Sequence, residues 1–248
     1  MPAFDYSRAP YAIRPDLADA FRRTWSWLAA PGSWWTGAER VAIAAEARAA
    51  RGCALCAEAK AALGPSAVTG EHDRAQTLLP GTAVDAVHRL MTDPARRSQG
   101  WLEKLLSEGE ISDAHYVELL GVVVCVLSID AFHRALGLAP EPLPEPELGD
   151  PSLQRPASAV PGVGWVPMIP EGQASGAEAD LYPKRAPNVL RAMSLVPDGV
   201  RRMRDLARAQ YVPVEQVANP TFSEGRALSR AQIELLAGRV SAVNECFY

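Results

Sequence analysis

Two cysteines, three residues apart, are the side chains of this sequence best suited to chemistry. Cys53 and Cys56 lie in the stretch RGCALCAEAK, directly after Gly52. Such a pair can be a redox dithiol, half of a metal site, or two small hydrophobic residues in an alanine-rich helix. A thiol reacts as its thiolate, and unpaired N–H groups in the first turn of a helix favour negative charge. Cys53 is expected in such a turn.

Two charged residues lie at helical spacing from this pair. Lys60 is one turn beyond Cys56, where its ammonium group would favour a thiolate, although a pKa near about 10.4 makes lysine a poor proton shuttle near neutral pH. Glu46 is two turns before Cys53 and can face the same way. Both are also typical of a solvated helix face, so a relay role for them stays an alternative.

Other candidate ligands do not form a pattern along the chain. His72, His88 and His115 show no spacing typical of a nucleophile or metal site. A zinc site needs four ligands, and no second close-spaced Cys/His pair completes one with the two cysteines. We therefore predict no metal and no cofactor. Cys125, inside VVVCVL, is predicted to be core.

Composition narrows the class of protein. The 248 residues carry 25 basic and 29 acidic side chains, a net charge of −4, without long runs of either sign, so nucleic acid is not an expected partner. The N-terminus has no apolar leader, and the longest apolar run, 119–129, is too short for a bilayer. Four cysteines in a chain this long argue against a disulfide framework. We expect a soluble cytoplasmic protein without a membrane partner.

Helical periodicity dominates, and strand-like alternation is nearly absent. Thr36 and Glu39 form a capping-box pattern, and Gly52 interrupts the helix that follows them. The predicted helices cover 16–28, 37–50, 53–63, 82–91, 99–108, 113–136, 188–193, 197–208 and 229 onward. The stretch from 139 is rich in proline and glycine, typical of an extended connector, with Trp165, Val166, Met168 and Ile169 to bury.

Two segments of the chain are weakly alike. TGAERVAIAAEARAARGCALC, from Thr36, aligns with SRAQIELLAGRVSAVNECFY, from Ser229, with capping hydroxyls, apolar positions and the first cysteine in register. Two alanine-rich helices can also be alike by chance. Because the second segment stops one residue before the counterpart of Cys56, we expect the biological chain to continue beyond Tyr248.

The second segment resembles the signature of the alkylhydroperoxidase D/carboxymuconolactone decarboxylase-like superfamily. Its motif residues are Glu234, Val240, Ser241, Asn244 and Cys246. The first segment is similar to a degenerate form of that unit, and AVHRLMTDPARR, YVELLGVVV and PLPEPELGDP are similar to two-unit, peroxidase-related members. The resemblance implies an all-α fold with two helical units, at 1–138 and 187–248, joined by a connector at 139–186.

In redox members of this superfamily, glutamate and histidine activate the dithiol to reduce a hydroperoxide. Transferred here, the resemblance implies that Cys56 attacks, Cys53 resolves, and Glu234 and Cys246 belong to a second centre. The first unit departs from the pattern, with Val41 in place of the glutamate and Lys60 in place of the histidine. The helix after the dithiol packs over it in the superfamily, so His133 or Glu118 can reach the thiols; a histidine satisfied at a helix C-terminus is the alternative.

The resulting hypothesis is a thiol-dependent hydroperoxide reductase, or antioxidant protein, that uses a small hydroperoxide and a dithiol reductant and forms homo-oligomers. One rival is a non-redox, decarboxylase-like enzyme on the same fold, whose activity thiol alkylation would not change. The other is a structural or interaction protein that lost the relay, in which Cys53 and Cys56 would have ordinary thiol pKa values.

Overall fold

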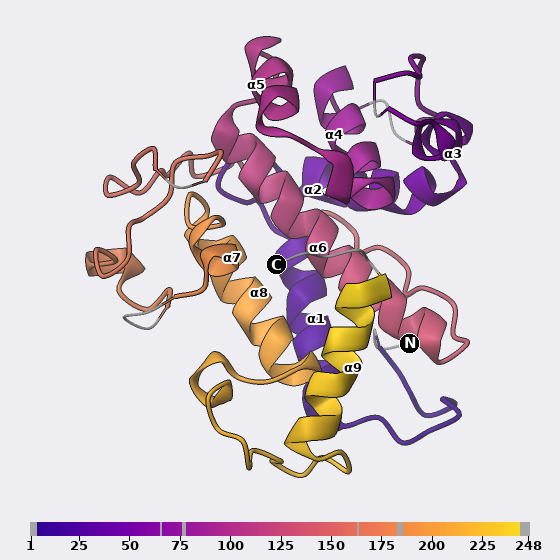
Figure 1. Ribbon diagram of the computed structural model, residues 1–248, viewed down its shortest axis with the longest axis vertical. Coiled ribbons are helices and arrows are strands. Elements are labelled where there is room, and N and C mark those ends of the chain that lie inside the picture. Colours follow the sequence, from indigo (N-terminus) through magenta and orange to yellow (C-terminus); the bar gives the residue numbers. More distant parts are fainter. Residues whose placement is uncertain (1–3, 65, 76–77, 163, 183–185, 244–248) are drawn as a thin grey trace.

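The regular structure of the protein is helical (Figure 1). The computed structural model describes residues 4–64, 66–75, 78–162, 164–182 and 186–243. Its α-helices are α1 (Pro15–Ala29), α2 (Gly37–Ala49), α3 (Ala54–Ala61), α4 (Gly81–Thr92), α5 (Gln99–Ser107), α6 (Asp113–Ala135), α7 (Asn188–Arg191), α8 (Pro197–Gln210) and α9 (Arg230–Val243). Within the described ranges, extended backbone pairs only in one antiparallel bridge, between Val160 and Met168. The all-α prediction is confirmed.

Helix α2 begins at the predicted capping box. The Thr36 hydroxyl accepts from the Glu39 N–H at 3.3 Å, and the Glu39 carboxylate accepts from the Thr36 N–H at 2.8 Å. This reciprocal pair satisfies two donors that the first helical turn cannot. After Ala49 a 3-10 turn, Ala50–Gly52, changes the direction of the chain before Cys53. The interruption predicted at Gly52 is therefore confirmed, and it separates α2 from α3.

Helix α6 is the central element of the fold. It packs against α1, α2, α4 and α8, and Figure 1 shows it running diagonally between the α2–α4 group and the α1–α8 pair. Cys125 is buried on it, as predicted, beside Phe21 and Ile129. Among the described helices, α6 alone has the length and composition to cross a membrane, and most of it is buried inside this protein. Most apolar residues of α6 are thus buried in the way expected for the core helix of a folded domain.

A buried ion pair joins α2 to α6. Arg40 Nε lies 3.4 Å from Glu118 Oε1, and both side chains are 2% exposed or less. The other Glu118 oxygen accepts from the Trp34 N–H at 2.6 Å. A Cβ on Gly32 would lie 1.7 Å from the Glu118 carboxylate, so the close approach of this turn requires glycine. Glu118 is therefore a partner of Arg40 and of the α1–α2 turn, and the suggestion that it reaches the thiols is wrong.

The connector carries little regular structure, as predicted. Its described residues contain one 3-10 turn, Gly176–Glu178. Val166, Met168 and Ile169 are buried, but Trp165 is 50% exposed, so its predicted burial is wrong. Trp165 lies in the turn closed by the bridge between Val160 and Met168, where the chain reverses at the surface.

Candidate functional site

Cys53 and Cys56 lie at the start of α3 and are buried, at 2% and 1% exposure. Cys53 is the N-cap residue, and Cys56 lies in the first turn. The sulfur atoms of Cys53 and Cys56 lie 3.6 Å and 3.5 Å from Nδ1 of His72. Cys56 Sγ also lies 3.4 Å from Nδ1 of His88. Two thiols and two imidazoles thus face one another at one point.

Each of the two histidines is backed by a carboxylate. His72 Nε2 lies 3.0 Å from Asp85 Oδ1, and His88 Nε2 lies 3.2 Å from Glu46 Oε2. A carboxylate only accepts hydrogen bonds, so each Nε2 carries the proton and each neutral imidazole presents its Nδ1 lone pair to the sulfur atoms. The carboxylates therefore fix both the tautomer and the orientation of the rings.

Side chains from the loop before α4 and from the 3-10 turn after it contact the two ends of α3. The Asp73 carboxylate, beside His72, accepts from the Ala54 N–H at 3.0 Å, where the helix N-terminus favours an anion. At the other end the Arg96 guanidinium donates to the carbonyl oxygens of Ala59 and Ala62, both at 2.8 Å. A cation is favourable there. These contacts position the short helix, and with it both cysteines.

Helix α4 supplies the other half of the site. Asp85 and His88 are three residues apart, so they lie on adjoining parts of one helix face. Arg89, four residues after Asp85, donates to the same carboxylate at 3.2 Å. Because α4 packs against α2, buried His88 faces buried Glu46, whose side chain is 0% exposed. The site therefore needs α2, α3, α4 and the loop before α4.

The two thiols differ in how readily they ionise. Burial would raise the pKa of the Cys53 thiol, but the backbone N–H groups of Cys56 and Asp73 and the His72 ring outweigh it and lower that pKa. Burial raises the pKa of the Cys56 thiol to about 11. The first thiolate is thus expected at Cys53.

The two histidines differ in how readily their rings take up a proton. Burial opposes the charged ring of His72, but the Asp85 carboxylate and Cys53 raise its pKa above the ordinary value. Burial lowers the pKa of His88 despite Glu46, and the neighbouring His72 adds to this effect. His72 is therefore the imidazole that takes up a proton more readily, beside the thiol that gives one up more readily.

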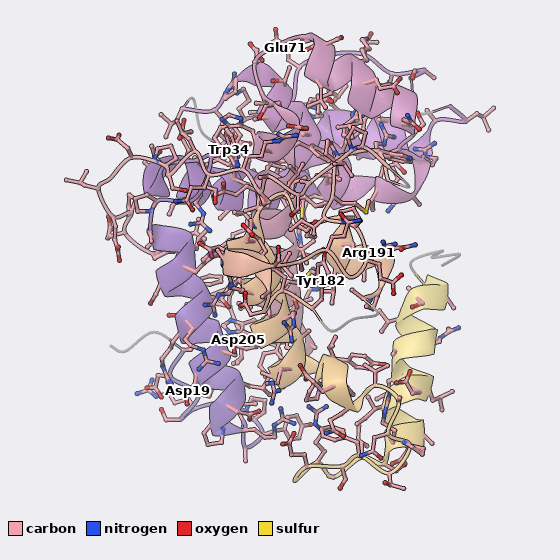
Figure 2. The ribbon with its side chains drawn as sticks, turned by 90° about the vertical axis from the view of Figure 1, so that its left-hand side faces the viewer. Asp19, Trp34, Glu71, Tyr182, Arg191 and Asp205 are labelled. Atoms are coloured by element: carbon pink, nitrogen blue, oxygen red, sulfur yellow. The ribbon has the colours of Figure 1, made fainter. Side chains whose placement is uncertain are left out.

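A pocket of about 290 Å³ lies on the outer side of this site. Asp85 and Arg89 border it, together with Thr69 from the loop. Figure 2 shows Glu71, the neighbour of His72 in that loop, at the surface at the end of the molecule remote from α9. Asp85, the partner of His72, is thus one of the residues that line the pocket.

No protein-family model, curated protein or solved structure matches the chain. The roles of the site residues therefore rest on the geometry and on the resemblance of the sequence motifs.

The expected relay residues have different surroundings. Glu46 is part of the site, where it accepts from His88 rather than contacting a thiol directly. Lys60 is exposed on α3, and its backbone carbonyl accepts from Arg96. His133 lies at the end of α6, where its ring bonds the Tyr6 hydroxyl at 2.7 Å and the Ala139 carbonyl at 2.8 Å. His133 is therefore a histidine satisfied at a helix C-terminus, as the alternative interpretation has it. The suggestion that it reaches the thiols is wrong.

Of the two residues in the second predicted centre, Glu234 is described, and it lies away from these thiols in the fold. Glu234 lies on α9, where its carboxylate accepts from the Tyr211 hydroxyl and pairs with Arg230. Figure 1 shows α9 in the half of the molecule away from α3 and α4. Cys246 lies outside the described residues. A second centre at these residues stays a prediction.

Sequence reasoning missed His72 and His88. They stand 16 and 32 residues after Cys56, in a loop and in a different helix, so no fixed spacing relates them to the cysteines. One signal was available. His88 and Arg89 lie three and four residues after Asp85 on a largely apolar helix, and polar side chains buried on such a helix need partners.

Proposed function

We propose that the protein is a thiol-dependent hydroperoxide reductase whose redox pair is Cys53 and Cys56. The observation that carries the proposal is the chain of contacts from Cys53 Sγ to His72 Nδ1, at 3.6 Å, and from His72 Nε2 to Asp85 Oδ1, at 3.0 Å. A thiol, an imidazole and a carboxylate in this order are the parts of an activated nucleophile. Cys56, three residues on, is the second thiol.

In the first step the Cys53 proton passes to Nδ1 of His72, and the Asp85 carboxylate stabilises the imidazolium that forms. The Cys53 thiolate attacks the outer oxygen of the hydroperoxide, and the O–O bond breaks. The leaving alkoxide takes the proton from His72 and departs as an alcohol. Cys53 is then a sulfenic acid.

In the second step Cys56 loses its proton to Nδ1 of His88, 3.4 Å away, and attacks the Cys53 sulfur. A disulfide forms, and the hydroxyl group leaves as water with that proton. An external dithiol then reduces the disulfide and restores both thiols. The surroundings thus favour Cys53 as attacker and Cys56 as resolver, the reverse of the order implied by the superfamily resemblance.

Burial also favours a substrate class. Both cysteines are 2% exposed or less, so we expect hydrogen peroxide and small alkyl hydroperoxides to react faster than bulky ones.

The test is peroxide consumption by metal-free protein with a dithiol reductant. We expect Cys53→Ser and Cys56→Ser each to abolish turnover, while Cys125→Ala, which removes a buried thiol elsewhere, retains it. A single-turnover experiment separates the roles, because a sulfenic acid should accumulate at Cys53 in Cys56→Ser. Turnover that survives in both serine variants would rule the proposal out.

A further inference from the structure

The same four side chains have a second property that does not depend on peroxide chemistry. Cys53, Cys56, His72 and His88 each offer one donor atom, and these atoms all lie within 4.8 Å of one another. They come from the start of α3, from the loop after it and from α4. We propose that the reduced protein binds a zinc ion at these four residues.

Three of the six separations between the donor atoms match those expected around a tetrahedral zinc ion. Bonds of about 2.3 Å to sulfur and about 2.0–2.1 Å to nitrogen place neighbouring sulfur and nitrogen donors roughly 3.5 Å apart. The sulfur of Cys56 lies 3.5 Å from Nδ1 of His72 and 3.4 Å from Nδ1 of His88. The sulfur of Cys53 lies 3.6 Å from Nδ1 of His72. Two cysteines and two histidines are a common ligand set of structural zinc.

The outer contacts of the histidines are those of metal ligands. A histidine that binds a metal through one ring nitrogen generally donates its other N–H to a carboxylate or carbonyl group. His72 and His88 both meet this requirement, through Asp85 and Glu46, while both Nδ1 atoms face the sulfur atoms. One such pair is common in a protein core. Here two such pairs converge on a cysteine pair, so four donor atoms meet and both histidines are held by a carboxylate.

Burial and charge favour a closed site with zinc rather than a hard cation. The cysteines and His88 are 2% exposed or less, and the His72 side chain is 6% exposed. Four protein ligands leave no open position, which is typical of a structural or stored metal. Thiolate and imidazole donors discriminate against calcium and magnesium, which prefer oxygen. Two thiolates neutralise the charge of the ion.

When zinc binds, it displaces the protons of the two thiols. In the metal-free dithiol, Cys53 and Cys56 can donate their S–H protons to His72 and His88, so the same contacts are satisfied by two protons. Zinc requires both thiolates, so its binding should release about two protons near neutral pH.

Zinc and the disulfide exclude each other, a consequence that rests on the proposed function, whereas zinc binding itself does not. When a hydroperoxide oxidises the two thiolates, the S–S bond forms, two protons are consumed, and an alcohol and water leave. Two of the four ligands are then lost and zinc is released. Zinc would therefore keep the two thiols reduced and bound until oxidation to the disulfide releases the ion.

The test is titration of reduced, metal-free protein with Co²⁺ and then Zn²⁺. We expect one Co²⁺ per chain, with the thiolate charge-transfer and tetrahedral absorption bands, and its displacement by Zn²⁺. Cys125→Ala should bind as wild type does. The Cys53→Ser/Cys56→Ser double variant should lose the charge-transfer band. Absence of these bands in wild type, or equal binding by the double variant, would overturn the proposal.

The carboxylates behind the two histidines give a graded test. Asp85→Asn and Glu46→Gln should each weaken zinc binding by about 10–100-fold, because each removes the carboxylate behind one histidine. Asp85 is partly exposed, so Asp85→Asn serves even if the buried Glu46 variant does not fold. Unchanged affinity in Asp85→Asn would contradict ligation by His72. Because metal is measured without peroxide, failure here leaves the reductase proposal intact, and the reverse also holds.

Discussion

Helices α2 and α9 begin alike and lie in different surroundings. Thr36 and Glu39 form the capping box of α2, and Ser229 and Gln232 form the same reciprocal pair at α9, at 2.8 Å and 3.4 Å. Beyond that start the two helices differ. Seven residues of α2 are buried and two of α9, Arg230 and Ile233. The local signal is shared, but the packing is not.

The glutamates of these two helices show what the packing changes. Glu46 of α2 is 0% exposed and accepts from His88, whereas Glu234 of α9 is 46% exposed and pairs with Arg230. Glu234 matches the superfamily motif and Glu46 does not. Yet Glu46 is the carboxylate that α4 brings to a thiol site. A motif match identifies a residue type at a spacing, and only a neighbouring element makes it part of a site.

The largest expected effect is on peroxide turnover, and it distinguishes the thiol site from α9. His72→Ala should lower peroxide turnover by about 10²–10⁴-fold, because the Cys53 thiol loses its base. Glu234→Gln is the matched test of α9 in the same assay. A comparable loss in Glu234→Gln would show that α9 takes part in the reaction, as the resemblance implies. Unchanged turnover would confine the chemistry to α2, α3, α4 and the intervening loop.

The order in which the thiols ionise sharpens the comparison within the site. In reduced, metal-free protein, iodoacetamide should modify Cys53 at the lowest pH. Cys56, with a pKa of about 11, and Cys125, with a pKa of about 12, should follow. Because the pKa of Cys53 is lowered and the pKa of Cys56 is raised, the thiolate fraction at neutral pH should be larger at Cys53. Peptide mass spectrometry across a pH series measures it.

The control for this prediction is Asp85→Asn. Loss of that carboxylate destabilises the His72 imidazolium and should shift the Cys53 profile to higher pH, while Cys125 is unaffected. Reaction of Cys56 before Cys53 would instead support the order of attack that the superfamily resemblance implies.

Stability should also differ between the two helices. Glu46→Ala leaves buried His88 without its acceptor and should lower the free energy of unfolding by about 2–4 kcal/mol. Glu234→Ala removes a half-exposed ion pair and should cost about 0–1 kcal/mol. Urea denaturation of both variants measures the difference. Equal losses would mean that α9 is packed as tightly as α2.

The smallest effect concerns the end of α3. Arg96→Ala removes the guanidinium that donates to the carbonyl oxygens of Ala59 and Ala62 and should slightly lower the stability of α3. Lys60→Ala, at an exposed position of the same helix, is the control and should change stability less. Hydrogen exchange of α3 amides reports the loosening directly. Unchanged exchange in Arg96→Ala would show that packing alone holds the helix.

Much of the fold could be predicted from the sequence because the relevant signals are local. The capping boxes at Thr36 and Ser229, the break at Gly52 and the apolar run of α6 each depend on a few neighbouring residues. Trp165 shows the limit, since hydrophobicity alone predicted its burial and the turn leaves it half exposed.

The site could be predicted only in part. Cys53 and Cys56 were identified because a two-residue gap on one helix is a local pattern. For Glu46 the sequence left open a relay role and a solvated helix face, and its partner was not found, since the contact to His88 joins residues 42 positions apart. Which histidine faces a thiol depends on how α4 packs, and no local rule specifies that.

The sequence by itself determined the helices, their caps and the cysteine pair, because hydrogen bonding and periodicity act within a few residues. The tertiary structure decided that His72 and His88 complete the site and that His133, Glu118 and Lys60 do not contact the thiols. The physical reason is burial. Packing α4 against α2 and α3 removes water from the polar side chains between them, so each must find its partner across helices.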